Sequence, residues 1–341
     1  MVRGLRFLVL AGSLSLAAMS TIAGQHAAGG TTPVKADKDR EKAQLAFQRD
    51  LVSVLAPRAD PLPLLAAALL ARPLENQPKT SSFHSLIGRA ADADGSNPAI
   101  SWVRLADCDA KADACPNSAA LEQLQKQAPD NAAMWLLKLG VDTHAMKQDA
   151  AREDLTRAAA AKLYDDYTGT SLKALSGSVG VLPPPADTLD PASTAGAAGM
   201  QAVLVYGLAS TQPQPGLQIT AKLCENAAGD ASIKTDCLKL GRTLEWSSSP
   251  LARSLGLHLR EVLADDPSQQ EDARRARLNL IWQLQNFGQL SARAQGDAAV
   301  AQHLLALARS GGTEMSVVLA ALRDNRIPTE APLDWKPQPP G

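Results

Sequence analysis

Residues 232–246 read SIKTDCLKLGRTLEW, and the spacing of their apolar residues decides the fold class. These residues recur at the period of one face of an α-helix: Ile233, Cys237, Leu240 and Leu244. The longest periodic segment, 269–289, repeats the pattern with Ala276, Leu280, Leu284 and Phe287 on one side and Glu271, Arg274, Arg275 and Gln285 on the other. Because such a helix has to bury its apolar face, we expect helices that pack against helices.

Pro, Gly and small capping residues divide the rest of the chain into similar segments. Before residue 179 we predict a helix that starts at Asp60-Pro61 and ends at Pro73, and others at 39–56, 82–91, 98–106, 118–128, 131–146, 150–163 and 166–175. After residue 194 we predict helices at 195–210, 217–227, 232–246, 250–264, 269–289, 298–310 and 313–325. The short connections between them favour antiparallel hairpins, so we predict an all-α protein.

The composition of the 341 residues supports this prediction. Ala and Leu make up about a third of the chain, whereas the β-branched residues Ile and Val make up only about 6%. The 34 Lys and Arg residues against 35 Asp and Glu residues give a formal charge of -1. A chain without a basic excess lacks the electrostatic footprint of a nucleic-acid-binding protein, so we expect no nucleic-acid partner.

The first 23 residues have the pattern of a secretory signal peptide. A basic start precedes an apolar run from Phe7 to Ser20, and Thr21-Ile22-Ala23 offers small residues to a signal peptidase. The run is too short to span a bilayer. A lipid anchor would need a Cys directly after the signal peptide, and the first Cys of the chain is Cys108. We therefore predict a periplasmic or secreted protein that is not a lipoprotein and has no transmembrane segment after cleavage, with 24–36 as a flexible leader.

The 4 cysteines of an exported chain predict disulfides, because the compartment is oxidising. Cys108 and Cys115 enclose a short polar loop, and Cys224 and Cys237 lie where two predicted helices connect. Of the three possible pairings, closeness in sequence favours the two local ones, Cys108 with Cys115 and Cys224 with Cys237. A zinc site is the rival interpretation, but neither pair has Cys-x-x-Cys spacing and no His lies beside either pair.

The segment 179–194 is the best candidate for a domain boundary. It contains Pro183, Pro184 and Pro185, and consecutive prolines cannot lie inside a helix. We expect a linker here between an N-terminal helical array at 37–178 and a C-terminal array at 195–326. The Pro-rich tail, 327–341, would lie extended against the body or hang free. Whether the two arrays form one continuous domain stays open.

The stretch from Pro129 to Ala161 resembles one tetratricopeptide-type repeat, a helix-turn-helix unit with an aromatic residue near its start. With Trp135 as that residue, three residues fall on matching positions of the second helix: Ala151, Leu155 and Ala158. The Leu139-Gly140 pair is offset by one residue, and Lys162-Leu163-Tyr164 replaces the closing proline. The layout also resembles uncharacterised exported helical proteins of bacteria, a family that implies a shape and no activity. These resemblances imply hairpins stacked as an irregular α-solenoid.

A group of aromatic and polar residues is our candidate partner-binding surface: Trp135, His144, Tyr164, Asp165, Asp166 and Tyr167. In a stacked hairpin array, a groove lined by aromatic rings and carboxylates could hold a peptide or a basic segment. The alternative is that Trp135 and Tyr164 pack between helices. We expect a protein or peptide partner and leave the oligomeric state open.

Searches for catalytic and metal-binding motifs find no complete pattern. The sequence contains no His-x-x-x-His pair, no Gly-x-Ser-x-Gly, no Ser-x-x-Lys and no Gly-rich phosphate loop. Residues 92–97 have the composition of a calcium loop, but Ala90 and Ser101 stand where that loop needs carboxylates, so a polar turn is the better interpretation. We predict no catalytic residue, no metal ligand and no cofactor.

Three functions are compatible with these observations. The leading hypothesis is a non-catalytic periplasmic protein-interaction or scaffold module. The second is a cell-wall-active or other hydrolytic enzyme whose catalytic groups meet only in the tertiary fold. The third is an inhibitor or immunity-type binder of a secreted toxin. A deep pocket that joins an acid to a histidine, with strongly shifted pKa values, would favour the enzyme.

Overall fold

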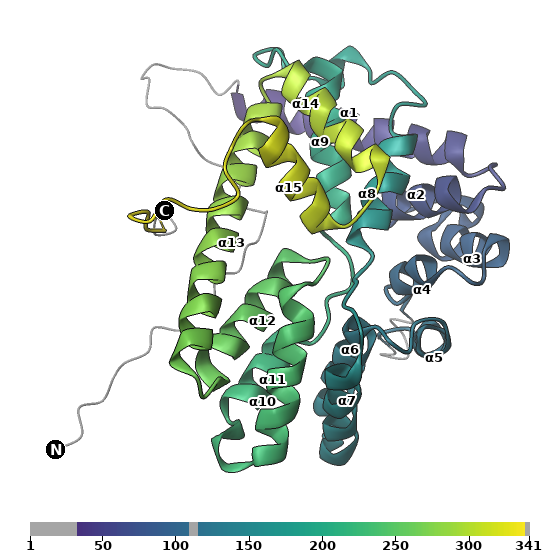
Figure 1. The fold of residues 1–341 in the computed structure, drawn as a ribbon. Helices are drawn as coiled ribbons and strands as arrows, with labels where there is room; N and C mark the ends of the chain where they lie inside the picture. Colours follow the sequence, from purple (N-terminus) through teal and green to yellow (C-terminus); the bar gives the residue numbers. More distant parts are fainter. Residues whose placement is uncertain (1–32, 109–114, 338–341) are drawn as a thin grey trace.

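The chain folds into 15 α-helices in a computed structural model that describes residues 33–108 and 115–337 (Figure 1). Within these ranges the one β feature is an isolated parallel bridge between Asn131 and Leu163. The all-α class is therefore confirmed, whereas the stacking of hairpins as an α-solenoid stays a prediction. The predicted signal peptide lies outside the described residues. The helix α1 begins at Pro33, inside the predicted leader.

Each predicted helix has one observed counterpart. Before the Pro-rich segment these are α1 (Pro33–Leu55), α2 (Pro61–Ala71), α3 (Phe83–Ala93), α4 (Pro98–Arg104), α5 (Ser118–Gln127), α6 (Ala132–His144), α7 (Gln148–Ala160) and α8 (Thr168–Ser178). After it come α9 (Gly196–Ala209), α10 (Leu217–Glu225), α11 (Ala231–Glu245), α12 (Pro250–Leu263), α13 (Pro267–Ala294), α14 (Ala298–Ser310) and α15 (Glu314–Asp324). Three short 3-10 helices lie at Lys79–Ser81, Ala186–Thr188 and Ala227–Gly229.

Capping chemistry explains where many of these helices begin. Pro occupies the first turn of α2, α4, α12 and α13, where a missing backbone N–H costs nothing. The Asp230 carboxylate accepts hydrogen bonds from the backbone N–H groups of Ser232 and Ile233 at the start of α11. Asp297 plays the same part at the start of α14. These caps satisfy backbone donors that the helix itself cannot satisfy.

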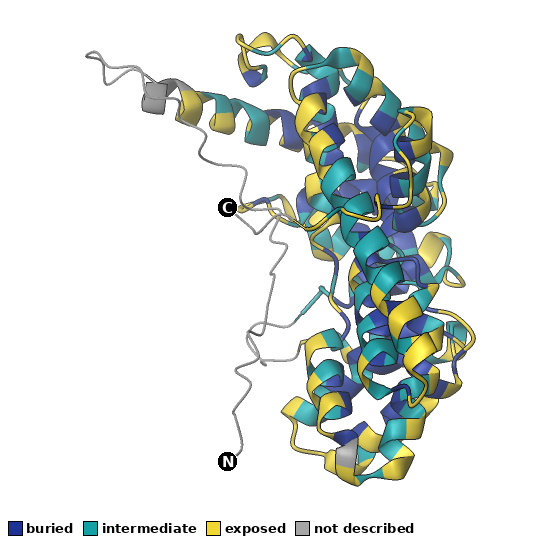
Figure 2. Cartoon of the chain, turned by 60° about the vertical axis from the view of Figure 1, so that its left-hand side comes forward, coloured by how far each residue is buried: buried dark blue, intermediate teal, exposed yellow. Residues whose placement is uncertain are grey.

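The apolar faces gather into two hydrophobic clusters. The first is built from α1, α2, α3, α8, α9, α13, α14 and α15, and α2 lies at its centre with every residue from Leu64 to Ala71 buried. The second is built from α5, α6, α7, α10, α11 and α12, together with Trp102 and Leu105. Figure 2 shows the buried residues where helices face one another, and the exposed start of α1 projecting from the body.

Each cluster combines helices from before and after the Pro-rich segment. Helix α8 packs on α9 and α14, and α7 packs on α11. The packing therefore does not divide the chain at 179–194. Within the described residues, no helix combines the length and apolarity needed to cross a bilayer.

The C-terminal tail lies extended along α13, one of the two predicted arrangements. Trp282 Nε1 donates to the carbonyl oxygen of Pro328 at 2.7 Å, and Gln283 Nε2 donates to that of Thr329 at 2.8 Å. The indole of Trp335 meets that of Trp282 edge-on, with ring centroids 5.3 Å apart. Side chains of α13 thus bind the tail mainly through its backbone.

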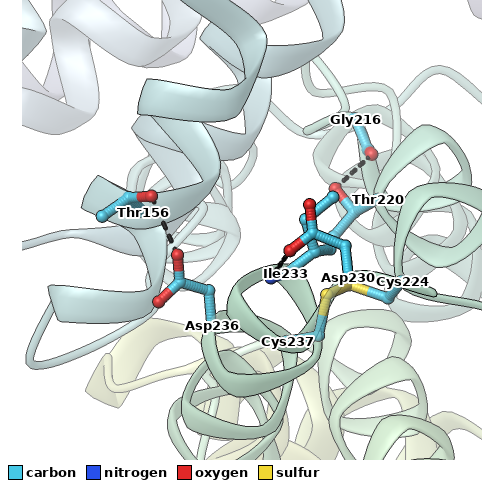
Figure 3. Close-up of a disulfide and its surroundings, with 8 residues drawn as sticks. All are labelled: Thr156, Gly216, Thr220, Cys224, Asp230, Ile233, Asp236 and Cys237. Atoms are coloured by element: carbon cyan, nitrogen blue, oxygen red, sulfur yellow. Dashed lines mark hydrogen bonds between the residues drawn. A yellow bond between two sulfur atoms is a disulfide. The ribbon is translucent and has the colours of Figure 1, made fainter. Parts of the chain in front are cut away.

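The structure pairs the cysteines locally, as the sequence favours. Cys108 bonds Cys115, and Cys224 at the end of α10 bonds Cys237 in α11. Both Cys224 and Cys237 are fully buried. Figure 3 shows this second disulfide beside the Asp230 cap and the hydrogen bond from Thr156 Oγ1 to Asp236, which ties α7 to α11. Two disulfides indicate an oxidising environment.

Replacing both Cys224 and Cys237 by Ala should lower the free energy of unfolding by about 3 kcal/mol, because the cross-link restricts the unfolded chain. Urea denaturation followed by circular dichroism measures the change. The Cys108→Ala, Cys115→Ala variant is the matched comparison, with an expected loss of about 2.5 kcal/mol for its shorter loop. An unchanged urea midpoint for the Cys224/Cys237 variant would contradict the pairing.

A charged cluster joins α6 to α7. Lys138 Nζ lies 2.6 Å from Asp142 Oδ2 and 3.0 Å from both carboxylate oxygens of Asp154. The Asp154 side chain is only 3% exposed. Burial raises the pKa of Asp154 to about 6, against the opposing effect of the Lys138 charge. Lys138 is therefore the cation that compensates two carboxyl groups within this hairpin.

Replacing Lys138 by Met should cost about 2 kcal/mol of stability, because it leaves the buried Asp154 carboxyl without its charged donor. Denaturation at pH 7 measures the loss. Lys162→Met is the control, since Lys162 pairs with Asp130 in full contact with solvent and should have no resolvable effect. Equal losses of stability for Lys138→Met and Lys162→Met would contradict the prediction that the buried ion pair contributes more than the exposed one.

Candidate functional site

Three segments that are distant in sequence meet at one junction between the two clusters: residues 164–168, 247–249 and 313–315. Ser248 N donates to the carbonyl oxygen of Tyr164 at 3.2 Å, and Met315 N donates to that of Ser248 at 3.0 Å. The middle segment connects α11 to α12, and the last one begins α15. These two backbone hydrogen bonds fix the start of α15 against the segment that leads into α8.

A close backbone approach explains the glycines beside this junction. A Cβ atom on Gly169 would lie 1.9 Å from the carbonyl oxygen of Gly312, so only glycine lets α8 come this close to the α14–α15 connection. Gly311 and Gly312 themselves have φ angles of 85° and 108°, in the region that favours glycine. The connection can therefore turn sharply and place Glu314, which is half-buried, at the junction.

A cavity of about 550 Å³ lies between α8, α9, α13, α14 and α15. Its wall is mostly apolar, with Leu172, Ala202, Phe287, Leu304 and Val318 among its residues. Thr168 and Glu314, from the junction, also line it. The volume falls in the range of small-molecule sites, roughly 300–1,000 Å³. An apolar chamber with a few convergent polar groups is the usual form of a ligand site.

Glu314 is the one ionisable carboxyl among the described residues that line the cavity, and no Lys, Arg or His of the described chain lines it. Burial in these apolar surroundings, followed by the nearby charge of Asp166, raises the pKa of Glu314 to about 8. Burial also raises the pKa of Asp165 and of Asp166. Glu314 therefore holds its proton at neutral pH while the cavity is empty.

The cavity opens to solvent along α9. Val203 and Gly207 line it and are exposed, with 52% of Val203 accessible. Tyr206 lies between them, donates from its hydroxyl to the Leu304 carbonyl oxygen at 3.0 Å, and packs its ring near that of Phe287. A second hollow of about 290 Å³, on the side of α1, shares Gly199 and Val203 with the first. Exposed residues of α9 thus line one opening of the cavity, and the lining residues Ser210 and Gln295 are exposed as well.

Three of the six predicted surface residues are buried, namely Trp135, Tyr164 and Asp166, and two more, Asp165 and Tyr167, are half-buried. Trp135 is 7% exposed, donates from Nε1 to the Pro129 carbonyl oxygen, and lies under the Arg157 guanidinium. Tyr164 and Asp166 are buried, and His144 is exposed at the last residue of α6. Trp135 and His144 therefore stand at opposite ends of one helix.

Asn131 holds the predicted Tyr164–Tyr167 segment in place. Its Nδ2 donates to the Asp165 carbonyl oxygen at 2.7 Å and to the Tyr167 hydroxyl at 3.1 Å. The Tyr167 ring packs edge-on against Trp102, with centroids 5.9 Å apart. The structure thus joins Tyr164, Asp165 and Asp166 to Glu314 at the junction, and Tyr167 packs with Trp102 instead of standing in an open groove.

Sequence reasoning missed Glu314 and the cavity. Glu314 follows the N-cap Thr313, whose side chain accepts from Ser316 N, and an acid in the first turn of a helix is ordinary capping chemistry. The one available signal was the Gly311-Gly312 pair before it, which indicates a sharp turn with left-handed backbone angles. Nothing local in the sequence shows that this turn faces an apolar chamber.

No group of three or more His, Cys, Asp or Glu residues in the described chain is placed to hold a metal ion. No protein-family model matches the sequence, and comparisons with curated proteins and with solved structures found no match. The geometry of the site is accordingly the basis for its functional interpretation.

The stability of the protein should fall as the pH rises from about 5 to about 8. The folded state holds the Glu314 proton up to about pH 8, whereas the unfolded chain releases it near the ordinary value of 4.5. Between these values the folded state binds more protons, so removing them favours unfolding. Glu314→Gln should flatten this slope and raise the stability at pH 8. Urea midpoints across the pH series measure it.

Glu330→Gln is the control for this experiment, because it removes an exposed carboxylate from the tail. It should leave the slope as it is in the unaltered protein. A Glu314→Gln protein whose stability keeps the same pH slope would show that the Glu314 carboxyl is solvated. A smaller pH slope should remain in the Glu314→Gln protein, because the pKa values of Asp165 and Asp166 are raised as well.

Proposed function

We propose that this chain is a non-catalytic binding protein of the periplasm or the extracellular space. The observation that supports this proposal best is the apolar cavity of about 550 Å³ with Glu314 and Thr168 at the junction. The two disulfides fit an exported location, and residues 1–23 would be the signal peptide that directs it there. The helices would form the scaffold, and the ligand would enter between Val203 and Gly207.

Ligand binding in the cavity accounts for features that a surface scaffold alone does not need. The Glu314 carboxyl lies in apolar surroundings, and this position lowers the stability of the protein at neutral pH. The close contact between Gly169 and Gly312 positions the start of α15, where this carboxyl lies. Residues that cost stability and converge on a cavity are typical of functional sites. A protein or peptide partner on an outer face would be compatible with this ligand site.

A hydrolytic enzyme is the second candidate, and the raised pKa of Glu314 is the observation that favours it, since a protonated carboxyl can act as a general acid. Such a mechanism would also need a nucleophile or base within hydrogen-bond reach. The described residues that line the cavity supply Thr168, Ser210, Thr211 and Ser291 as hydroxyls, with no histidine to activate one. Binding is therefore the function that we propose.

Plugging the cavity mouth should abolish binding of an apolar fluorescent probe. N-phenyl-1-naphthylamine should gain fluorescence with the unaltered protein and lose that gain with Gly207→Trp. A Cβ atom on Gly207 meets no other atom within 4 Å, so a side chain can start there without a clash at its first atom. Fluorescence titration at pH 7 measures the affinity, and Val203→Trp should act in the same way.

Gly177→Trp is the matched control, because Gly177 is an exposed residue of α8 with equally open surroundings and does not line the cavity. It should bind the probe like the unaltered protein. Binding that survives both Gly207→Trp and Val203→Trp would place the probe elsewhere. A protein that does not bind the probe at all would contradict the proposed function.

A further inference from the structure

We propose that the cavity accepts a cationic amphiphile, whose apolar chain fills the space between α9, α13 and α15 and whose primary ammonium group binds Glu314 and Thr168 at the junction. This inference names the ligand class of the site and rests on the proposed binding function. It is carried by the acidic groups at the junction and by the size and apolar lining of the cavity.

The charges at the junction are of one sign. Glu314 faces the cavity, and Asp166 and Asp165 stand behind it on the segment before α8. Among the described residues, no ion pair joins any of these three carboxyls to Lys, Arg or His. A head group that carries positive charge would compensate them, whereas a carboxylate or phosphate head group would be repelled.

The neighbouring basic side chains are engaged with other groups. Lys173 of α8 lies against Gly311, and Arg309 of α14 donates to the Ser176 carbonyl oxygen. Arg253 of α12 donates to the carbonyl oxygen of Ser247. Arg253 and Arg309 thus point their charges at backbone. Arg72, which follows α2, donates to the carbonyl and hydroxyl oxygens of Thr211, elsewhere on the cavity wall. Among the described residues Glu314 has no ion-pair partner, so a ligand that carries a cation could pair with it once the carboxyl has released its proton.

A buried hydroxyl at the junction lacks a hydrogen-bond partner. Tyr164 is 3% exposed, and its hydroxyl makes no hydrogen bond in the described structure. Burial, followed by the charges of Asp166, Glu314 and Asp165, raises its pKa, so it lies among the same carboxyls. Tyr164 does not itself line the cavity, so the polar contacts that the junction offers a ligand there are Glu314 and Thr168. An ammonium group carries three donors, enough for Glu314, Thr168 and a third acceptor.

The remainder of the cavity suits a single aliphatic chain. Leu172, Phe287, Leu304, Val317 and Val318 offer apolar surface on several sides, and the mouth at Val203 lets the end of the chain reach solvent. Each methylene that moves from water into the cavity contributes about 0.8 kcal/mol to the free energy of binding. The chain would therefore provide affinity, and the head group would provide selectivity.

Competition against the fluorescent probe tests this ligand class with the full chain. The competitors are decylamine, 1-decanol and decanoate, which share a chain and differ in head group. At pH 8 decylamine should displace the probe at a concentration roughly tenfold lower than 1-decanol, since a hydrogen-bonded charge pair is worth about a factor of ten or more. Decanoate should compete least. Equal or better competition by decanoate would overturn the proposal.

Glu314→Gln should remove the preference for decylamine over 1-decanol, because glutamine keeps the shape of the side chain and loses its charge. Glu330→Gln should retain the preference. If the probe and 1-decanol bind while the preference is absent in the unaltered protein, the cavity binds ligands without the predicted selectivity and only this inference fails. If neither the probe nor 1-decanol binds, the proposed function fails.

The pH dependence gives an independent readout. Decylamine affinity should rise from pH 6 to pH 8, because Glu314 has to release its proton before it pairs with the ammonium group. At pH 7 calorimetry in buffers of different ionisation enthalpy should detect the release of close to one proton for each ligand bound, and none for Glu314→Gln. Binding without proton release would contradict an ion pair at Glu314.

Discussion

The structure depends on two backbone hydrogen bonds that bring three distant segments together, from Ser248 to Tyr164 and from Met315 to Ser248. They lie where the two hydrophobic clusters adjoin, and they determine where α15 begins. Because Gly169 allows the backbone of α8 to touch Gly312, the first residue of α15 is half-buried and lines the cavity. The position of the Glu314 carboxyl is a direct consequence of this contact.

A carboxyl at the wall of an apolar cavity needs either a neighbouring cation or a functional explanation, since isolated charges are not stable in apolar surroundings. The Lys138 cluster shows how the same chain compensates a buried acid when structure alone requires it, with an ammonium group 3.0 Å from Asp154. The described structure offers Glu314 no such cation. The contrast between the two sites is the physical reason to assign a ligand to one and a structural role to the other.

The helices and the disulfide pairs could be predicted because their determinants are local. The period of Ile233, Cys237, Leu240 and Leu244 needs no tertiary information, and the closeness of each cysteine pair favours one pairing. The segment Tyr164–Tyr167 was predicted as part of a partner-binding surface, but its residue types do not reveal whether they face solvent or a neighbouring helix. The meeting of residues 164–168 with 247–249 and 313–315 is nonlocal, so the cavity and Glu314 could not be predicted from the sequence pattern.

The protonation of Glu314 is the property that can be measured most directly. Carbon-13 NMR of protein labelled at the glutamate carboxyls, titrated from pH 4 to pH 10, reports each side chain separately. One resonance should titrate near pH 8, and it should be absent from the Glu314→Gln protein. Titration of every glutamate close to the ordinary value of 4.5 would show that Glu314 is in contact with water, and a buried acidic site in the cavity would then be contradicted.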